Sequence, residues 1–230
     1  MMRFDAVAFD LDGTLYPSYR LYARAFPRML GKARILEAFN ETRSRLRALG
    51  SEGALRGKLG SSGAAAGDAF RALEAELMAE RLGIGVPEAA MMIDRDFYRG
   101  VEELFSRIRP FRGLKSTLDA IAGSGLRIAL LSDLPPARKL ELLGLSGSFE
   151  FALCSEDIGY LKPAKEPFAE LASRLGLEPG RILYVGNSPS IDVAGAKAAG
   201  MSAAIVSFRR VAGADLSFFD WRSLAEFAVS

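Results

Sequence analysis

The hydrophobic positions of the 230-residue chain divide it into two kinds of segment. Short continuous apolar runs, typical of buried parallel strands, occur at residues 6–9, 126–131, 151–153, 182–185 and 203–206. Helical periodicity separates the later runs, at residues 114–123, 137–143, 167–175 and 191–199. Because strand and helix alternate from residue 113 onward, the pattern predicts an α/β fold with a Rossmann-like, doubly wound parallel sheet.

The first apolar run is separated from the other four by a long segment of helical periodicity, residues 15–108. Its predicted helices span residues 19–49, with a break near Pro27 and Gly31, then 68–82 and 87–105. The glycine-rich stretch 50–67 favours a loop, because six glycines would cost a helix roughly 5 kcal/mol relative to alanine. We therefore predict a helical domain at 15–108, inserted into a core domain made of 1–14 and 109–230.

Charge and composition exclude several classes of partner. The 30 Lys and Arg residues nearly balance the 28 Asp and Glu residues, and no block of like charges predicts binding to nucleic acid or to a membrane surface. We interpret the basic triplet Arg43, Arg45 and Arg47 as a solvated helix face. No apolar run approaches the roughly 18 residues of a membrane span. With one cysteine and no cationic leader at its start, the chain is expected to be cytoplasmic.

The chain contains no histidine, which removes many catalytic mechanisms. Ser-His-Asp and Cys-His nucleophile pairs and histidine-bearing zinc sites all require that residue. Catalysis must then depend on carboxylates, lysines, hydroxyls or a hard metal ion.

Polar clusters follow four of the predicted strands. Taken singly, each has a structural interpretation, such as a turn cap, a strand-end hydroxyl or a solvated lysine. The carboxyl ends of parallel strands, however, lie at one edge of a sheet, where open α/β sheets bind ligands. We therefore expect one shared site formed by Asp10, Asp12 and Thr14, then Ser132 and Asp133, then Lys162, and finally Asn187 and Asp192.

These residue types suit phosphoryl transfer. A carboxylate such as Asp10 is a competent nucleophile toward a phosphoryl group if Mg²⁺ screens the repulsion between the two anions. Mg²⁺ prefers oxygen ligands, here available from the Asp10 side chain, the Asp12 backbone carbonyl, and the Asn187 and Asp192 side chains. Ser132 and Lys162 are placed to hold the remaining phosphoryl oxygens.

The four ordered clusters resemble the sequence motifs of the haloacid dehalogenase (HAD) superfamily. Asp10 through Thr14 match its first motif, Ser132 its second, Lys162 before a proline its third, and residues 186–192 its fourth. The resemblance implies that Asp10 forms an aspartyl-phosphate and that Asp12 acts as acid and then base. It also implies that residues 15–108 are a helical cap of the C1 class. The substrate phosphate is then expected to contact Thr14, Ser132, Asp133 and Lys162.

The resemblance leads us to expect a Mg²⁺-dependent phosphatase acting on a small phosphorylated metabolite. Two alternatives remain open. A 2-haloacid dehalogenase uses the same nucleophile on carbon, although a departing halide needs no proton and gives Asp12 no task. A non-catalytic binding protein of the same fold is supported only by Asn187, which stands where the fourth motif usually has aspartate, and which should hold Mg²⁺ less strongly.

Overall fold

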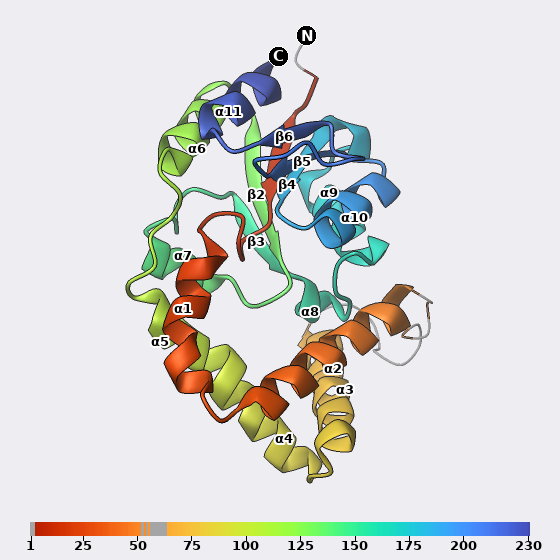
Figure 1. Ribbon diagram of the computed structural model, residues 1–230. Coiled ribbons are helices and arrows are strands. Elements are labelled where there is room, and N and C mark those ends of the chain that lie inside the picture. Colours follow the sequence, from red (N-terminus) through yellow and green to blue (C-terminus); the bar gives the residue numbers. More distant parts are fainter. Residues whose placement is uncertain (1–2, 52, 54, 56–63) are drawn as a thin grey trace.

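A parallel sheet of six strands forms the centre of the computed structural model, which describes residues 3–51, 53, 55 and 64–230 (Figure 1). The strand order is β3-β2-β1-β4-β5-β6, so the chain moves outward from β1 first on one side and then on the other. The doubly wound prediction is therefore confirmed. The strands are β1 (Ala6–Phe9), β2 (Arg127–Ser132), β3 (Phe151–Cys154), β4 (Ile182–Gly186), β5 (Ser202–Val206) and β6 (Leu216–Phe218).

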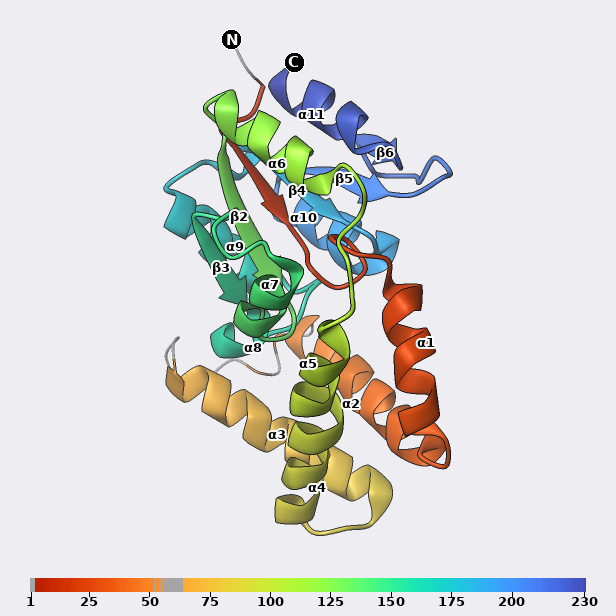
Figure 2. The ribbon, with the colours of Figure 1, turned by 90° about the vertical axis from the view of Figure 1, so that its left-hand side faces the viewer.

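Alternate residues of the buried strands point into two separate cores. In β1, Val7 and Phe9 pack into one apolar cluster, whereas Ala6 and Ala8 pack into the other. The first core is covered by α6 (Leu114–Gly123), α7 (Ala137–Leu143) and α11 (Trp221–Val229). The second is covered by α9 (Lys165–Leu175) and α10 (Ala194–Ala198), on the opposite face of the sheet (Figure 2). Burial on both faces explains why these strands are continuous apolar runs.

Five of the six strands lie where the apolar runs predicted them. β6 was not predicted, because three residues are too few to show a period, and neither was the C-terminal helix α11. Two short elements were also not predicted: α8 (Ser155–Ile158) and the 3₁₀ turn η2 (Pro179–Arg181). The helix predicted at 191–199 begins as the π-helical turn η3 (Pro189–Val193) and continues as α10.

The elements between Ser18 and Phe105 are all helical in the described part of the chain, and they lie beyond the carboxyl ends of the strands (Figure 1). They will be called the helical segment, whose status as a separate domain stays a prediction. Its elements are α1 (Ser18–Met29), α2 (Ala33–Ser51), α3 (Ala64–Leu82), α4 (Val86–Ile93), η1 (Asp94–Arg99) and α5 (Gly100–Phe105).

The predicted break in the first long helix is only partly correct. Helix α1 continues through Pro27 and ends two residues later, so the proline removes a hydrogen bond only in the last turn. The break lies at Gly31, whose φ of +80° favours glycine. Of the glycine-rich stretch 50–67, Gly50 and Gly67 are helical, and most of the remainder falls outside the described residues. None of the helices in the described ranges is long and apolar enough to cross a membrane.

Candidate active site

The loops after β1 and β4 bring the first and fourth polar clusters together. These two strands are neighbours at the centre of the sheet, where the winding direction reverses. Asp10 follows β1 directly and Asn187 follows β4 directly. Gly13 has a φ of +87°, and a Cβ at this position would collide with the Asn187 side chain, so the glycine lets the two loops approach closely. The site thus lies at the topological switch point of the sheet.

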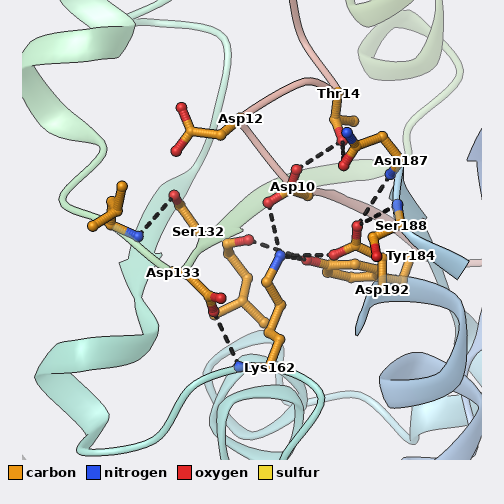
Figure 3. A network of polar contacts seen from close by, with 12 residues as sticks. Asp10, Asp12, Thr14, Ser132, Asp133, Lys162, Tyr184, Asn187, Ser188 and Asp192 are labelled. Carbon is orange, nitrogen blue, oxygen red and sulfur yellow. Dashed lines mark hydrogen bonds and ion pairs between the residues drawn. The ribbon is translucent and has the colours of Figure 1, made fainter. Parts of the chain in front are cut away.

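Asp10 is the central carboxylate of the site (Figure 3). Its Oδ2 accepts a hydrogen bond from Thr14 Oγ1 at 2.7 Å, and its Oδ1 is 2.7 Å from Lys162 Nζ. Burial raises the pKa of Asp10 to about 7, and the lowering effect of Lys162 is partly offset by Asp192. The carboxylate is therefore desolvated, and its charge depends on nearby cations.

Lys162 links the third cluster to the first and the fourth. Its ammonium donates to Asp10, to Asp192 Oδ1 at 2.8 Å and to the Tyr184 hydroxyl at 3.0 Å. Burial alone would lower the pKa of Lys162, but Asp10 and Asp192 raise it well above its usual value. The lysine therefore stays charged although it is 2% exposed. Tyr184 was not predicted as part of the site, because a tyrosine inside an apolar strand is indistinguishable from a core residue.

Asp192 is held in place by the loop that precedes it. Its Oδ2 accepts hydrogen bonds from the backbone N–H groups of Asn187 and Ser188, at 3.1 and 2.9 Å. A Cβ at Gly186 would overlap the Asp192 side chain, so this glycine makes room for the carboxylate. The fourth motif thus places one acidic side chain beside Lys162 and leaves the Asn187 amide directed toward Thr14, at 3.4 Å.

Asp12 lies apart from this cluster, and Figure 3 shows its carboxylate directed away from Asp10. The ammonium of Lys139, on α7, donates to both Asp12 oxygens at 2.6 and 2.8 Å, and the Tyr16 hydroxyl donates at 2.7 Å. Lys139 is 4% exposed whereas the Asp12 side chain is 31% exposed, so the ammonium is shielded from solvent and the carboxylate remains accessible. Lys139 was not predicted as part of the site, although it lies in the first turn of the helix that follows the second motif.

The two residues of the second cluster have different partners in the protein. The Ser132 hydroxyl is buried and accepts a hydrogen bond from Leu134 N at 3.3 Å. Both oxygens of Asp133 are engaged by protein groups: Oδ1 accepts from Lys162 N, and Oδ2 accepts from Arg47, each at 3.0 Å. In this arrangement Asp133 joins two loops and a helix, and its contact with the substrate phosphate stays a prediction.

The donor groups at the strand edge fit a hard divalent cation. Asp10 Oδ2 and Asn187 Oδ1 both lie within 3.4 Å of the same Thr14 hydroxyl, so a carboxylate and an amide oxygen converge there. Two carboxylates, Asp10 and Asp192, against one ammonium leave the cluster with an excess of negative charge, and all of these donors are oxygens. No group of three or more His, Cys, Asp or Glu side chains within the described ranges forms a metal cage. Any cation would then be completed by water and substrate oxygens.

Several relatives of this chain are named phosphoglycolate phosphatase or glyceraldehyde 3-phosphate phosphatase. A glyceraldehyde 3-phosphate phosphatase from Methanopyrus kandleri is 31% identical over 85% of this chain and 81% of its own length. A phosphoglycolate phosphatase from Yersinia pestis is 30% identical over 87% of this chain and 81% of its own length. A second glyceraldehyde 3-phosphate phosphatase, from Methanothermobacter thermautotrophicus, is 35% identical, but the match covers only 45% of this chain and 47% of that protein.

Solved structures share the fold and divide between two activities. A 2-haloacid dehalogenase from Pseudomonas syringae pv. tomato has a TM-score of 0.63 at 24% identity, with 97% of each chain covered. A HAD phosphatase from Thermococcus onnurineus has a TM-score of 0.59 at 23% identity, again with 97% of each chain covered. The backbone alone does not distinguish a phosphatase from a dehalogenase.

Sequence and geometry agree on the family. The profile of haloacid dehalogenase-like hydrolases matches residues 4–200, a range that contains every residue of the predicted site. The four motifs meet at the carboxyl edge of the sheet in the order the resemblance implies. This chain belongs to the haloacid dehalogenase-like hydrolase family.

Proposed function

We propose that the protein is a Mg²⁺-dependent phosphatase of the cytoplasm, acting through an aspartyl-phosphate on a small phosphorylated metabolite. The observation that carries the proposal is the pair of carboxylates Asp10 and Asp12, which are two residues apart and have different partners. Asp10 lies between a hydroxyl and the ammonium of Lys162, whereas Asp12 is held by Lys139 and Tyr16. Two acids in different environments suit a nucleophile and a proton carrier.

In the proposed reaction, an Asp10 oxygen attacks phosphorus and the bond from phosphorus to the leaving oxygen breaks. Asp12, in its protonated form, gives its proton to that oxygen. Asp12 then takes a proton from a water molecule, whose oxygen attacks the phosphorus of the Asp10 acyl phosphate. The bond from phosphorus to the Asp10 oxygen breaks, which releases phosphate and restores the Asp10 carboxylate. Lys162 and Ser132 stabilise the phosphoryl oxygens, and Lys139 and Tyr16 orient Asp12. Bound Mg²⁺, held by Asp10, the Asp12 carbonyl, Asn187 and Asp192, would screen the charge of nucleophile and substrate.

The relatives suggest the size of the substrate. They are named for phosphoglycolate and glyceraldehyde 3-phosphate, which carry two or three carbon atoms. We propose a phosphorylated acid or aldehyde of this size.

The test compares Asp10→Asn with Asp119→Asn, an exposed aspartate on α6. Hydrolysis of p-nitrophenyl phosphate and 2-phosphoglycolate with Mg²⁺ should fall by at least about 10⁴-fold in Asp10→Asn, because loss of a nucleophile removes the covalent route. The control should keep its rate, and both variants should keep the wild-type circular dichroism spectrum. Retained activity in Asp10→Asn would refute the nucleophile. Release of chloride from 2-chloropropionate without Mg²⁺, together with no phosphatase activity, would make the protein a dehalogenase.

A further inference from the structure

The three arginines in the middle of α2 face two different directions. Arg45 is exposed and pairs with the exposed Glu80 of α3 at 2.8 Å. Arg43 and Arg47 lie four residues apart, on the helix face turned toward the sheet. The solvated-face interpretation is therefore right for Arg45 and wrong for Arg43 and Arg47. The spacing of the three arginines does not reveal which of them are buried, because the elements packed against a helix decide which of its faces is covered.

Arg47 closes a ring of hydrogen bonds around the backbone of Lys162. Its Nη2 donates to Asp133 Oδ2 at 3.0 Å, and its Nε donates to the carbonyl oxygen of Lys162 at 3.1 Å. The other Asp133 oxygen accepts from Lys162 N at 3.0 Å. One side chain of the helical segment thus holds the Lys162 backbone directly through its carbonyl, and through Asp133 at its N–H.

This ring is connected to the Asp10 nucleophile through the side chain of Lys162. The Lys162 side chain runs from the ring to Asp10 and Asp192, so a shift of the Lys162 backbone moves the ammonium that contacts both. Burial would raise the pKa of Asp133, but Lys162, Arg43 and Arg47 lower it below its usual value. Asp133 is therefore an ionised acceptor, and hydrogen bonds to ionised groups are the stronger kind.

Arg43 holds α2 in place one turn before Arg47. Its guanidinium contacts Glu74 of α3 at 3.1 Å and Glu156 of α8, which belongs to the core. The Tyr98 hydroxyl lies within hydrogen-bond distance of both carboxylates, at 3.0 and 2.9 Å. With the helix fixed at this point, Arg47 reaches Asp133 from a defined position.

We infer that Arg47 is a positioning residue for phosphoryl transfer: through Asp133 and the Lys162 backbone it sets the position of the Lys162 ammonium, without touching the substrate. The inference rests on the proposed function. If Arg47 has this role, the full rate of the reaction depends on how α2 packs against the loops that follow β2 and α8.

The kinetic experiment compares Arg47→Met, Arg47→Lys and the matched control Arg45→Met, two residues away on the same helix. Substrates are p-nitrophenyl phosphate, whose leaving group has no carboxylate, and 2-phosphoglycolate. Arg47→Met should lower kcat by about 10- to 100-fold with both substrates, because small misplacements of a catalytic group cost this much. KM should stay within about twofold. Arg47→Lys should recover only part of kcat, since lysine lacks the two-pronged geometry, and Arg45→Met should match wild type.

A different kinetic pattern would overturn the inference. If Arg47→Met raises KM for 2-phosphoglycolate and leaves hydrolysis of p-nitrophenyl phosphate unchanged, Arg47 binds the substrate carboxylate. If the variant matches wild type with both substrates, the ring has no influence on the reaction.

A second measurement does not depend on activity. Amide hydrogen exchange of Lys162 should be faster in Arg47→Met than in Arg45→Met, while Ala129, in the centre of β2, serves as an internal reference for global unfolding. Unchanged protection of Lys162 in Arg47→Met would refute the positioning role. If wild-type protein hydrolyses no phosphate ester, the proposed function fails, and the exchange of Lys162 still decides whether Arg47 holds its backbone.

Discussion

Two buried clusters in the molecule each contain one cationic side chain, two carboxylates and one tyrosine hydroxyl, but their surroundings differ. The first, the strand-edge cluster, consists of the ammonium of Lys162, the carboxylates of Asp10 and Asp192, and the hydroxyl of Tyr184. Tyr184 belongs to β4 and Asp192 to η3, whereas Asp10 and Lys162 lie in the loops after β1 and α8. One oxygen of Asp10 also faces Thr14, next to the amide of Asn187.

The second, the helix cluster, consists of the guanidinium of Arg43, the carboxylates of Glu74 and Glu156, and the hydroxyl of Tyr98. Three of its members come from the helical segment, and Glu156 comes from α8 in the core. Here the cation and the hydroxyl each reach both carboxylates, so the members satisfy one another.

The comparison shows that perturbed ionisation does not by itself identify an active site. Burial raises the pKa of Asp10 to about 7, and burial raises the pKa of Glu156 to about 7. What differs is the neighbourhood: the strand-edge cluster adjoins further oxygen donors at a switch point of the sheet, whereas the helix cluster joins helices. We therefore expect the first to govern rate and the second to govern stability.

The largest expected effect comes from removing the cation of each cluster. Lys162→Met should lower kcat for p-nitrophenyl phosphate by about 10²–10³-fold, because a donor to the phosphoryl oxygens is lost. Arg43→Met should lower the free energy of unfolding in urea by about 3–5 kcal/mol, because two buried carboxylates lose their partner. Arg45→Met, the exposed control, should change stability by no more than about 0.5 kcal/mol.

The comparison fails if the effects are exchanged. A Lys162→Met protein with wild-type kcat, or an Arg43→Met protein with wild-type stability, would show that the surroundings do not separate the two clusters. For Arg43→Met, kcat is measured at a temperature where the variant is folded.

An intermediate effect concerns pH and the helix cluster. Burial raises the pKa of Glu156 to about 7 from its usual 4.5, so between these values the folded protein binds a proton that the unfolded chain has lost. Its contribution to stability is therefore fully present below about pH 4.5 and is lost as the pH rises through about 7. Between pH 5 and pH 8, wild-type protein should lose about 1–3 kcal/mol more unfolding free energy than Glu156→Gln.

Urea unfolding at several pH values checks this prediction, with Glu80→Gln as an exposed control that should follow wild type. Arg43, Glu74 and Tyr98 face Glu156 from the helices packed against α8, and they are unchanged in both variants. If the free energy of unfolding falls with pH in the same way in wild type and Glu156→Gln, the pH dependence comes from a group other than Glu156.

The smallest effects should come from the two tyrosines. Tyr98→Phe removes a hydroxyl that lies between both carboxylates of the helix cluster, and should cost about 1–3 kcal/mol of stability with kcat unchanged. Tyr184→Phe removes one partner of Lys162 and a donor to the Leu131 carbonyl, and should lower kcat by less than about tenfold. Equal effects of the two variants on kcat would contradict the expectation that the strand-edge cluster governs rate and the helix cluster governs stability.

Much of the candidate site could be predicted because its residues are tied to strands. Asp10, Ser132, Lys162 and Asn187 each follow an apolar run, and a parallel sheet brings the ends of such runs to one edge. Lys139 could not be found in this way, because a lysine on an amphipathic helix is normally solvated. Only the packing of α7 beside the loop after β1 places its ammonium on Asp12.

The sequence by itself determined the sheet, its buried strands and the order in which the polar clusters meet, because short-range periodicity and parallel topology are properties of the chain. The tertiary structure decided the partners of those clusters: that Arg43 and Arg47 turn inward while Arg45 does not, and that Asp133 serves a helix and a loop. The physical reason is that a helix has no preferred neighbour until another surface buries one of its faces, and burial then converts an exposed charge into a paired one.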